Sequence, residues 1–310
     1  MDSTITNPKY VRMLMPESCV GRIEHLDYLI EFYFKVMVAL GKVKFKSLFR
    51  AQMTSSLQMI YTKAKSMRQL VEGFRQQGGV PLVYCQADHT VLYTIVRAAY
   101  EQLCAFELIY VIPDTEEKRL VMKDAYIAAG EVNRLKLFTE ESLERNKERA
   151  DSVRDVIEDC RREIHSTHFY KALSDKEKTE FEKQVFKKGE YRIILNEKGK
   201  RIVNVGWDEV RNYCRLNTDA LHGVYKYACN MAHPSYLGLV QFHEAYKEGV
   251  IDDLNATAVM QMISIMSVFI MDFMEVYPEI QNVYTDLDHE SQFAIRMYNE
   301  CFRGDSVNYS

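Results

Sequence analysis

Residues 255–271, which decide the fold class, read NATAVMQMISIMSVFIM and form a run of 17 residues without a charged side chain. A membrane-spanning helix needs about 20 predominantly apolar residues. This run is shorter, contains one glutamine and two serines, and has acidic residues on both sides. We therefore expect a buried core helix over residues 254–277 and no contact with a membrane.

Helical periodicity extends outward from this run over most of the chain. Apolar residues recur at three- and four-residue steps in two long segments that we expect to end at Gly41 and at Gly78-Gly79. Asp88 is a candidate N-cap for a third helix that is apolar on nearly every face and ends at Pro113. Further helices are expected over 116–137, 140–165, 207–216, 218–233 and 291–302, with short ones after Ser174 and Pro234. The pattern predicts an all-α fold, a multi-helix bundle of about ten helices.

Two short β-branched runs interrupt the helical pattern. Residues 191–195 and 200–205 flank the turn Asn-Glu-Lys-Gly, which is typical of a β-hairpin. A lone hairpin is only marginally stable in water, so we expect it to pack on helices.

The segment 140–165 is highly charged and carries a narrow apolar stripe at heptad spacing. Such a stripe indicates a helix with contacts on one side, available to a protein partner or to a second copy of the chain. The expected organisation is a terminal segment over 1–19, a bundle over 20–138, a charged arm with the hairpin over 139–205, the rest of the bundle over 206–303, and a tail over 304–310.

Composition excludes several classes of function. Net charge is −4, from 40 basic and 44 acidic residues, so the chain as a whole is not a polycationic nucleic-acid binder. The N-terminal residues lack the apolar core of a secretory signal, which makes the cytoplasm the expected location. The 7 cysteines never occur as C-x-x-C, and no phosphate-binding loop or zinc-protease motif is present. We expect no metal and no cofactor.

The segment 215–235 is the richest in chemical groups. On one continuous helix, His222, Lys226, Cys229 and His233 would lie within about 60° of each other, with the two imidazoles roughly 16 Å apart. That separation is too large for a shared metal ion. His233 precedes Pro234, where it can act in acid–base chemistry or hold the turn through a hydrogen bond.

Arg97 and Glu101 are four residues apart on the apolar third helix. Buried charges are unfavourable unless they are paired, so we expect an ion pair or a network with His233 or Tyr227. The same combination of acid, guanidinium and imidazole is also typical of an active site.

Residues 225–235, YKYACNMAHPS, together with Trp207 and the Arg97-x-x-x-Glu101 helix, carry a resemblance. This set resembles an uncharacterised bacterial all-helical family that is known as a domain of unknown function, over about residues 91–277. Cys229 stands where that family usually has serine. The resemblance implies a helical architecture and a motif whose binding candidates are Tyr225, Tyr227, Cys229, Asn230 and Ser235.

A second resemblance rests on Arg215 and His222, which are spaced as in the Arg-x(4–6)-His signature of the HEPN superfamily. That likeness implies metal-independent cleavage of RNA. A histidine would act as general acid or base, and an arginine would hold the phosphate. The catalytic candidates are therefore His233, His222, Arg215, Arg97 and Glu101.

Basic residues gather around the predicted hairpin, with seven basic and two acidic residues over 183–201. The candidates for phosphate contact are Lys187, Lys188, Arg192, Lys200 and Arg201, although a solvated charged face is the simpler interpretation. His165 and His168 lack a third ligand nearby in the sequence and are expected to be a surface pair.

Two hypotheses follow. The chain is a binding or regulatory protein, for example of a bacterial stress or phage-defence system, or it is a HEPN-like metal-independent ribonuclease. Whether it is an enzyme stays open at this point.

Overall fold

The computed structural model describes most of the chain. The described residues are 19–45, 47–76, 83–85, 88–139, 145–195, 202–214, 216 and 223–303. Over these residues the fold is all-α, as the periodicity predicts, with two very short strand pairs.

The chain divides into two compact units. Met1–Leu103 and Arg215–Ser310 form the first unit, and Cys104–Cys214 form the second. The sequence analysis assigned residues 104–138 to the bundle, whereas this segment groups with the charged arm. The packing of α5 (Glu116–Lys136) on α7 (Lys147–Ser166) accounts for the difference.

The first unit holds the long apolar helices. Its described elements are α2 (Cys19–Leu40), α3 (Leu48–Val71), β1 (Phe74–Gln76), β2 (Val83–Cys85), the start of α4 (His89–Phe106), α12 (Val224–Ala232), α13 (Tyr236–Glu248), α14 (Ile251–Val276), η3 (Pro278–Ile280), α15 (Gln281–Thr285) and α16 (His289–Arg303).

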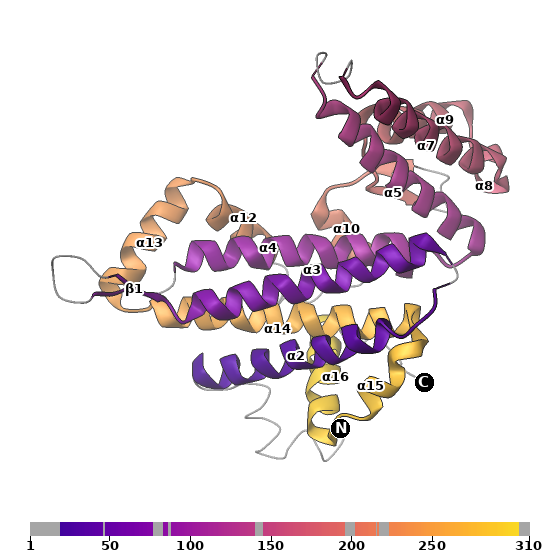
Figure 1. Cartoon of the computed structure of the whole chain (residues 1–310). Helices are drawn as coiled ribbons and strands as arrows, with labels where there is room; N and C mark the ends of the chain where they lie inside the picture. Colours follow the sequence, from indigo (N-terminus) through magenta and orange to yellow (C-terminus); the bar gives the residue numbers. More distant parts are fainter. Residues whose placement is uncertain are drawn as a thin grey trace. The chain divides into compact units, whose positions relative to one another are not determined.

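Helix α14 is the centre of this unit and confirms the expected core helix. It packs on α2, α3 and α16, and it lies beside α2 and α3 in Figure 1. Every residue from 261 to 270 is buried. The hydroxyls of Ser264 and Ser267 donate to carbonyls one turn earlier in the same helix, which satisfies both groups in an apolar setting.

By length and composition alone, α14 would be long and apolar enough to cross a membrane, but 78% of its most apolar window is buried inside the protein. The Tyr33 hydroxyl of α2 also donates to the Met266 carbonyl over 2.7 Å. This contact ties the middle of α14 to a neighbouring helix.

A second hairpin, which the sequence analysis missed, follows α3. Strands β1 and β2 pair antiparallel with Phe74 opposite Cys85. The expected end of the helix at Gly78-Gly79 was wrong, because α3 ends at Val71 and Gly73 adopts a left-handed φ of 71°. Three-residue strands are too short to show an alternating pattern.

The second unit contains η1 (Glu107–Val111), α5, α7, α8 (His168–Lys171), α9 (Asp175–Phe181), η2 (Glu182–Lys188), β3 (Ile193–Leu195), β4 (Ile202–Asn204) and α10 (Trp207–Tyr213). Pairing of β3 with β4 confirms the predicted hairpin. Ser174 and Glu177 form the predicted capping box at the start of α9.

The heptad-like stripe of α7 is buried within this unit. Its residues Ala150, Val153, Ile157, Cys160 and Ile164 are all covered, and α5 is the main neighbour of α7. The apolar face of α7, which the sequence analysis expected to be available to a partner, therefore packs inside the second unit.

Candidate functional site

Helices α4 and α12 bring four predicted site residues together. Arg97 and Glu101 lie one turn apart on α4, and the Arg97 Nε–H donates to Glu101 Oε1 over 3.0 Å. Arg97 Nη1 lies 2.6 Å from Nε2 of His233, the residue that follows α12. The Tyr225 hydroxyl, at the start of α12, donates to Glu101 Oε1 over 2.9 Å. The expected network between Arg97, Glu101 and His233 is present.

This cluster is partly open to solvent. The side chains of Arg97 and Glu101 are 26% and 27% exposed, and His233 is exposed. A guanidinium has five N–H donors and no acceptor. The contacts with Glu101 and His233 use two of these donors, and within the described residues the other three N–H groups of Arg97 are open to a ligand.

Tyr225 is held by its ring as well as by its hydroxyl. The ring stacks on Tyr100 with centroids 5.2 Å apart, and the Arg97 guanidinium lies 5.9 Å from the ring centre. Burial is the largest of the causes that raise the pKa of Tyr225 well above its ordinary value, followed by hydrogen bonds with Cys229 and Glu101. The phenol therefore stays protonated and remains a donor to Glu101.

The remaining residues of the 225–235 motif build the turn between α12 and α13. The Tyr227 hydroxyl donates to Gln241 on α13, and its ring meets Tyr93 edge to face at 4.7 Å. The Ser235 hydroxyl donates to the Asn230 carbonyl over 2.8 Å and accepts the first-turn N–H of Gly238 as the N-cap of α13. These contacts are structural.

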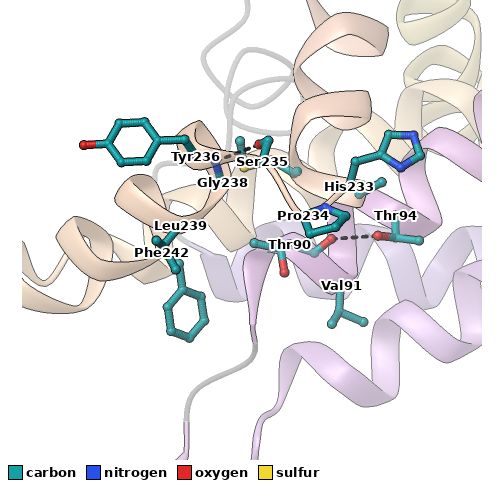
Figure 2. Close-up of a pocket in the computed structure, with 12 residues that line it drawn as sticks. Thr90, Val91, Thr94, His233, Pro234, Ser235, Tyr236, Gly238, Leu239 and Phe242 are labelled. Carbon is teal, nitrogen blue, oxygen red and sulfur yellow. Dashed lines mark hydrogen bonds between the residues drawn. The ribbon is translucent and has the colours of Figure 1, made fainter.

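A groove of about 570 Å³ opens beside the cluster. Figure 2 shows side chains of α4 and α13 around it, with His233 and Pro234 in the turn between α12 and α13. Among the described residues, the lining is mostly apolar and includes no Asp, Glu, Lys or Arg. Its residues are Thr90, Val91, Thr94, Met231, Ala232, His233, Pro234, Ser235, Tyr236, Gly238, Leu239 and Phe242.

One wall of the groove belongs to an apolar surface that the sequence analysis did not identify. We call Tyr236, Leu239, Phe242 and Tyr246 the α13 stripe. Tyr236 is 83% exposed and Leu239 68%, and Phe242 and Tyr246 are also exposed. The apolar spacing within residues 236–246 was visible in the sequence, but such spacing is equally typical of a buried face.

Comparison of the chain with protein-family models, curated proteins and solved structures yields no match. The two resemblances therefore stay predictions, and the site is interpreted from its own geometry.

Four other predicted site residues lie outside the described residues: Arg215, His222, Lys200 and Arg201. The described helix α12 begins at Val224 and follows a turn at Gly223, so the expected continuous helix over 218–233 is shorter than predicted. His233 is its C-cap, with extended backbone.

The remaining phosphate-contact candidates belong to the second unit. Lys187 and Lys188 are exposed at the end of η2. Arg192 is engaged within the unit, because it pairs with Glu190 at 2.9 Å and lies 5.2 Å from the ring of Trp207. It is therefore less available to phosphate than the sequence suggested.

His165 does not act together with His168. Its Nε2 lies 2.7 Å from Glu182 Oε1, while the His168 backbone N–H donates to Glu117. In the described part of the chain, no group of three or more His, Cys, Asp or Glu side chains is arranged to hold a metal ion.

Proposed function

We propose that this chain is a binding protein whose α13 stripe docks a helix of a protein partner. The observation that carries this proposal is an exposed row of four large apolar side chains, Tyr236, Leu239, Phe242 and Tyr246, of which the first three line an open groove. Soluble proteins seldom expose contiguous apolar patches of this kind unless the patch binds something.

The spacing of the stripe favours a helix as the docked element. Its residues are three, three and four positions apart, so they lie along one face of α13. Side chains in such a row form a ridge that fits between the ridges of another helix.

The groove chemistry disfavours nucleic acid at this surface. Phosphate recognition relies on Lys, Arg and backbone N–H groups, and the described residues of the lining include no Lys or Arg. Apolar burial is therefore the main source of affinity available here.

A display library of helical segments tests the proposal. The wild-type protein is immobilised at low density beside Leu239→Asp and, as a matched control, Leu137→Asp. Leu137 is 84% exposed and belongs to the other unit. We expect segments that are enriched on the wild type and the control but lost on Leu239→Asp. Equal enrichment on all three proteins, or none on any, would contradict docking at α13.

The contact between Arg97 and His233 favours a second candidate function, metal-independent cleavage of an RNA phosphodiester. An imidazole at an exposed rim can transfer a proton, and the unused N–H groups of Arg97 can hold a phosphate as charge develops. The proposed HEPN likeness points to the same chemistry through Arg215 and His222.

Incubation with defined RNAs in EDTA tests this candidate. Wild type is compared with His233→Ala, Arg97→Met and His222→Ala, with His243→Ala as an exposed-histidine control on α13. Each variant is first checked for a cooperative unfolding transition. Cleavage that is lost in His233→Ala and kept in His243→Ala supports the candidate, and absence of cleavage by the wild type removes it.

A further inference from the structure

One hydrogen bond holds the turn between α12 and α13 against α4. The turn consists of His233, Pro234 and Ser235, and Nε2 of His233 lies 2.6 Å from Nη1 of Arg97. The Ser235 hydroxyl donates to the Asn230 carbonyl, so it bonds α12 and not α4. Within the described residues, the contact between Arg97 and His233 is therefore the single hydrogen bond that joins this turn to α4.

This hydrogen bond requires a neutral imidazole. A guanidinium only donates, so Nε2 of His233 has to offer its lone pair to Arg97. A proton that binds Nε2 occupies the same lone pair and leaves two cationic donors facing each other, with no acceptor between them. Arg97 and a proton from solvent thus compete for one nitrogen atom, and only one of them can be bound at a time.

The groups around this contact leave the imidazole as its acid-sensitive member. Glu101 of α4 accepts from Arg97 Nε, and Tyr225 and Cys229 of α12 lie beside the guanidinium. Burial is the largest of the causes that raise the pKa of Tyr225. The described groove residues of α4 and α13 add no charged side chain. Of the side-chain types in this cluster, only imidazole ordinarily changes charge between about pH 5 and 8.

The protonated ring has a favourable position outside the contact. His233 is exposed and is the C-cap of α12, so an imidazolium there faces water and the negative end of the helix dipole. The charge of Arg97 stays balanced by Glu101 at 3.0 Å. Protonation therefore breaks the contact and leaves both cations in surroundings that accommodate them.

Helix α12 keeps its place on α4 when this hydrogen bond is lost. The Tyr225 hydroxyl donates to Glu101, the Tyr225 ring stacks on Tyr100, and Tyr227 meets Tyr93 edge to face. None of these contacts uses an imidazole. The change on protonation is therefore local to the turn at residues 233–235.

This turn is also part of the groove. Residues 233–235 line the groove together with Thr90 and Thr94 of α4, as Figure 2 shows. We infer that His233 is a proton-sensitive switch of the groove: the neutral imidazole holds the turn on α4, and protonation in mildly acidic solution releases it. The switch goes beyond the proposed docking function. A partner docked in the groove would bind with an affinity that depends on pH.

Solvent exchange of the Arg97 Nη–H groups, followed by nitrogen-15 NMR on the full chain, tests the inference. Arg68 is the matched control, because its guanidinium bonds Asp27 and Glu72 and no histidine. Relative to Arg68, the Arg97 groups should lose protection about tenfold between about pH 8 and 5, since a hydrogen bond to a charged group contributes at least that factor to an equilibrium. An unchanged ratio in the wild type overturns the inference.

His233→Gln provides a second test. The glutamine oxygen can accept from Arg97 but does not titrate, so the exchange ratio should stay constant over the same pH range. In the wild type, the backbone amide signals of Thr94 and Ser235 should move together with the ring signals of His233, and in His233→Gln they should not move. Signals that move at residue 233 alone would overturn the release of the turn.

A second histidine near the groove gives the competing explanation. His89 is buried and stacks on the groove residue Phe242 with centroids 6.1 Å apart. A pH response that persists in His233→Gln and disappears in His89→Leu would overturn the assignment to His233. The wild-type measurement needs no partner, so its outcome is independent of whether α13 docks one.

Discussion

Arg97 and His233 are in direct contact, with Nη1 of the guanidinium 2.6 Å from Nε2 of the imidazole. A guanidinium can only donate, so Nε2 of His233 must be the acceptor and the ring proton lies on Nδ1. The pair joins α4 to the end of α12, and Glu101 balances the charge of Arg97 at 3.0 Å.

This contact predicts the tautomer of His233. In the folded protein, nitrogen-15 NMR of the imidazole should show the Nδ1-protonated form, because Nε2 is occupied by the Arg97 donor. Arg97→Met removes the donor and should shift the ring toward the Nε2-protonated form. His243, which is exposed on α13, provides a ring signal that should not respond. An Nε2-protonated His233 in the wild type would refute the contact.

The buried pair of Asp272 and Arg303 should be the most sensitive polar contact. Their side chains are 4% and 6% exposed, and Asn299 accepts a further hydrogen bond from Arg303. Asp272→Asn removes the carboxylate that pairs with this buried guanidinium, so urea denaturation should show a loss of about 3–5 kcal/mol in the free energy of unfolding.

Two comparisons check this interpretation. The double change Asp272→Leu with Arg303→Met removes both charges and should recover most of the loss. At the exposed pair of Glu31 and Lys35, Glu31→Gln should change the free energy of unfolding by less than about 0.5 kcal/mol. A similar small effect at Asp272 would mean that its pair is solvated.

His25 should make the protein less stable in acid. Burial lowers the pKa of His25 from 6.5 to about 4 in the folded chain. The unfolded chain therefore binds the proton first, so stability is full above pH 6.5 and falls until the pH reaches about 4. The shift corresponds to a loss of about 3 kcal/mol in the free energy of unfolding.

Replacement of the ring isolates this contribution. His25 lies against the ring of Tyr298 at 5.3 Å, so His25→Phe keeps an aromatic contact and removes the titrating group. The free energy of unfolding should be measured from about pH 7 to about pH 4 in both proteins. Over this range it should fall by about 3 kcal/mol less in His25→Phe than in the wild type. Equal falls in both proteins would assign the acid sensitivity to other groups.

Gly189 should not tolerate a side chain. Its φ is +69°, and a Cβ atom would lie 2.5 Å from Oδ1 of Asn133. The same asparagine donates to the Gly189 carbonyl over 2.8 Å. Gly189→Ala should lower the midpoint of thermal unfolding. The expected loss in the free energy of unfolding is about 1–3 kcal/mol.

Gly130 provides the matched control within the same unit. It is exposed in α5, and a Cβ atom there would have no neighbour within 4 Å. Gly130→Ala should raise stability by about 0.5–1 kcal/mol, because alanine favours a helix. The two substitutions are thus expected to have opposite signs, and a stabilised Gly189→Ala would contradict the backbone geometry.

Local signals in the sequence predicted the elements that depend on neighbouring residues. The charge-free run predicted α14, Ser174 and Glu177 predicted the start of α9, and the two β-branched runs predicted β3 and β4. Each signal lies within one turn or one hairpin, where hydrogen bonds and side-chain spacing act over a few residues.

Contacts between distant residues were harder to predict. The heptad stripe of α7 suggested a partner outside the chain, but α5 covers it. A narrow apolar row has the same sequence pattern whether its cover is another molecule or a helix of the same chain. An exposed apolar row lies instead on α13, where the sequence indicated only a short helix after Pro234.

The sequence by itself determined the helical class, the buried central helix and the group of residue types from which a site can be built, because these follow from side-chain spacing and charge. Only the tertiary structure decided that Arg97 meets His233, 136 residues away in the chain, and that α13 keeps an apolar face exposed. The physical reason is that burial is a property of packing: the same side chain is core or surface according to which distant helix lies against it.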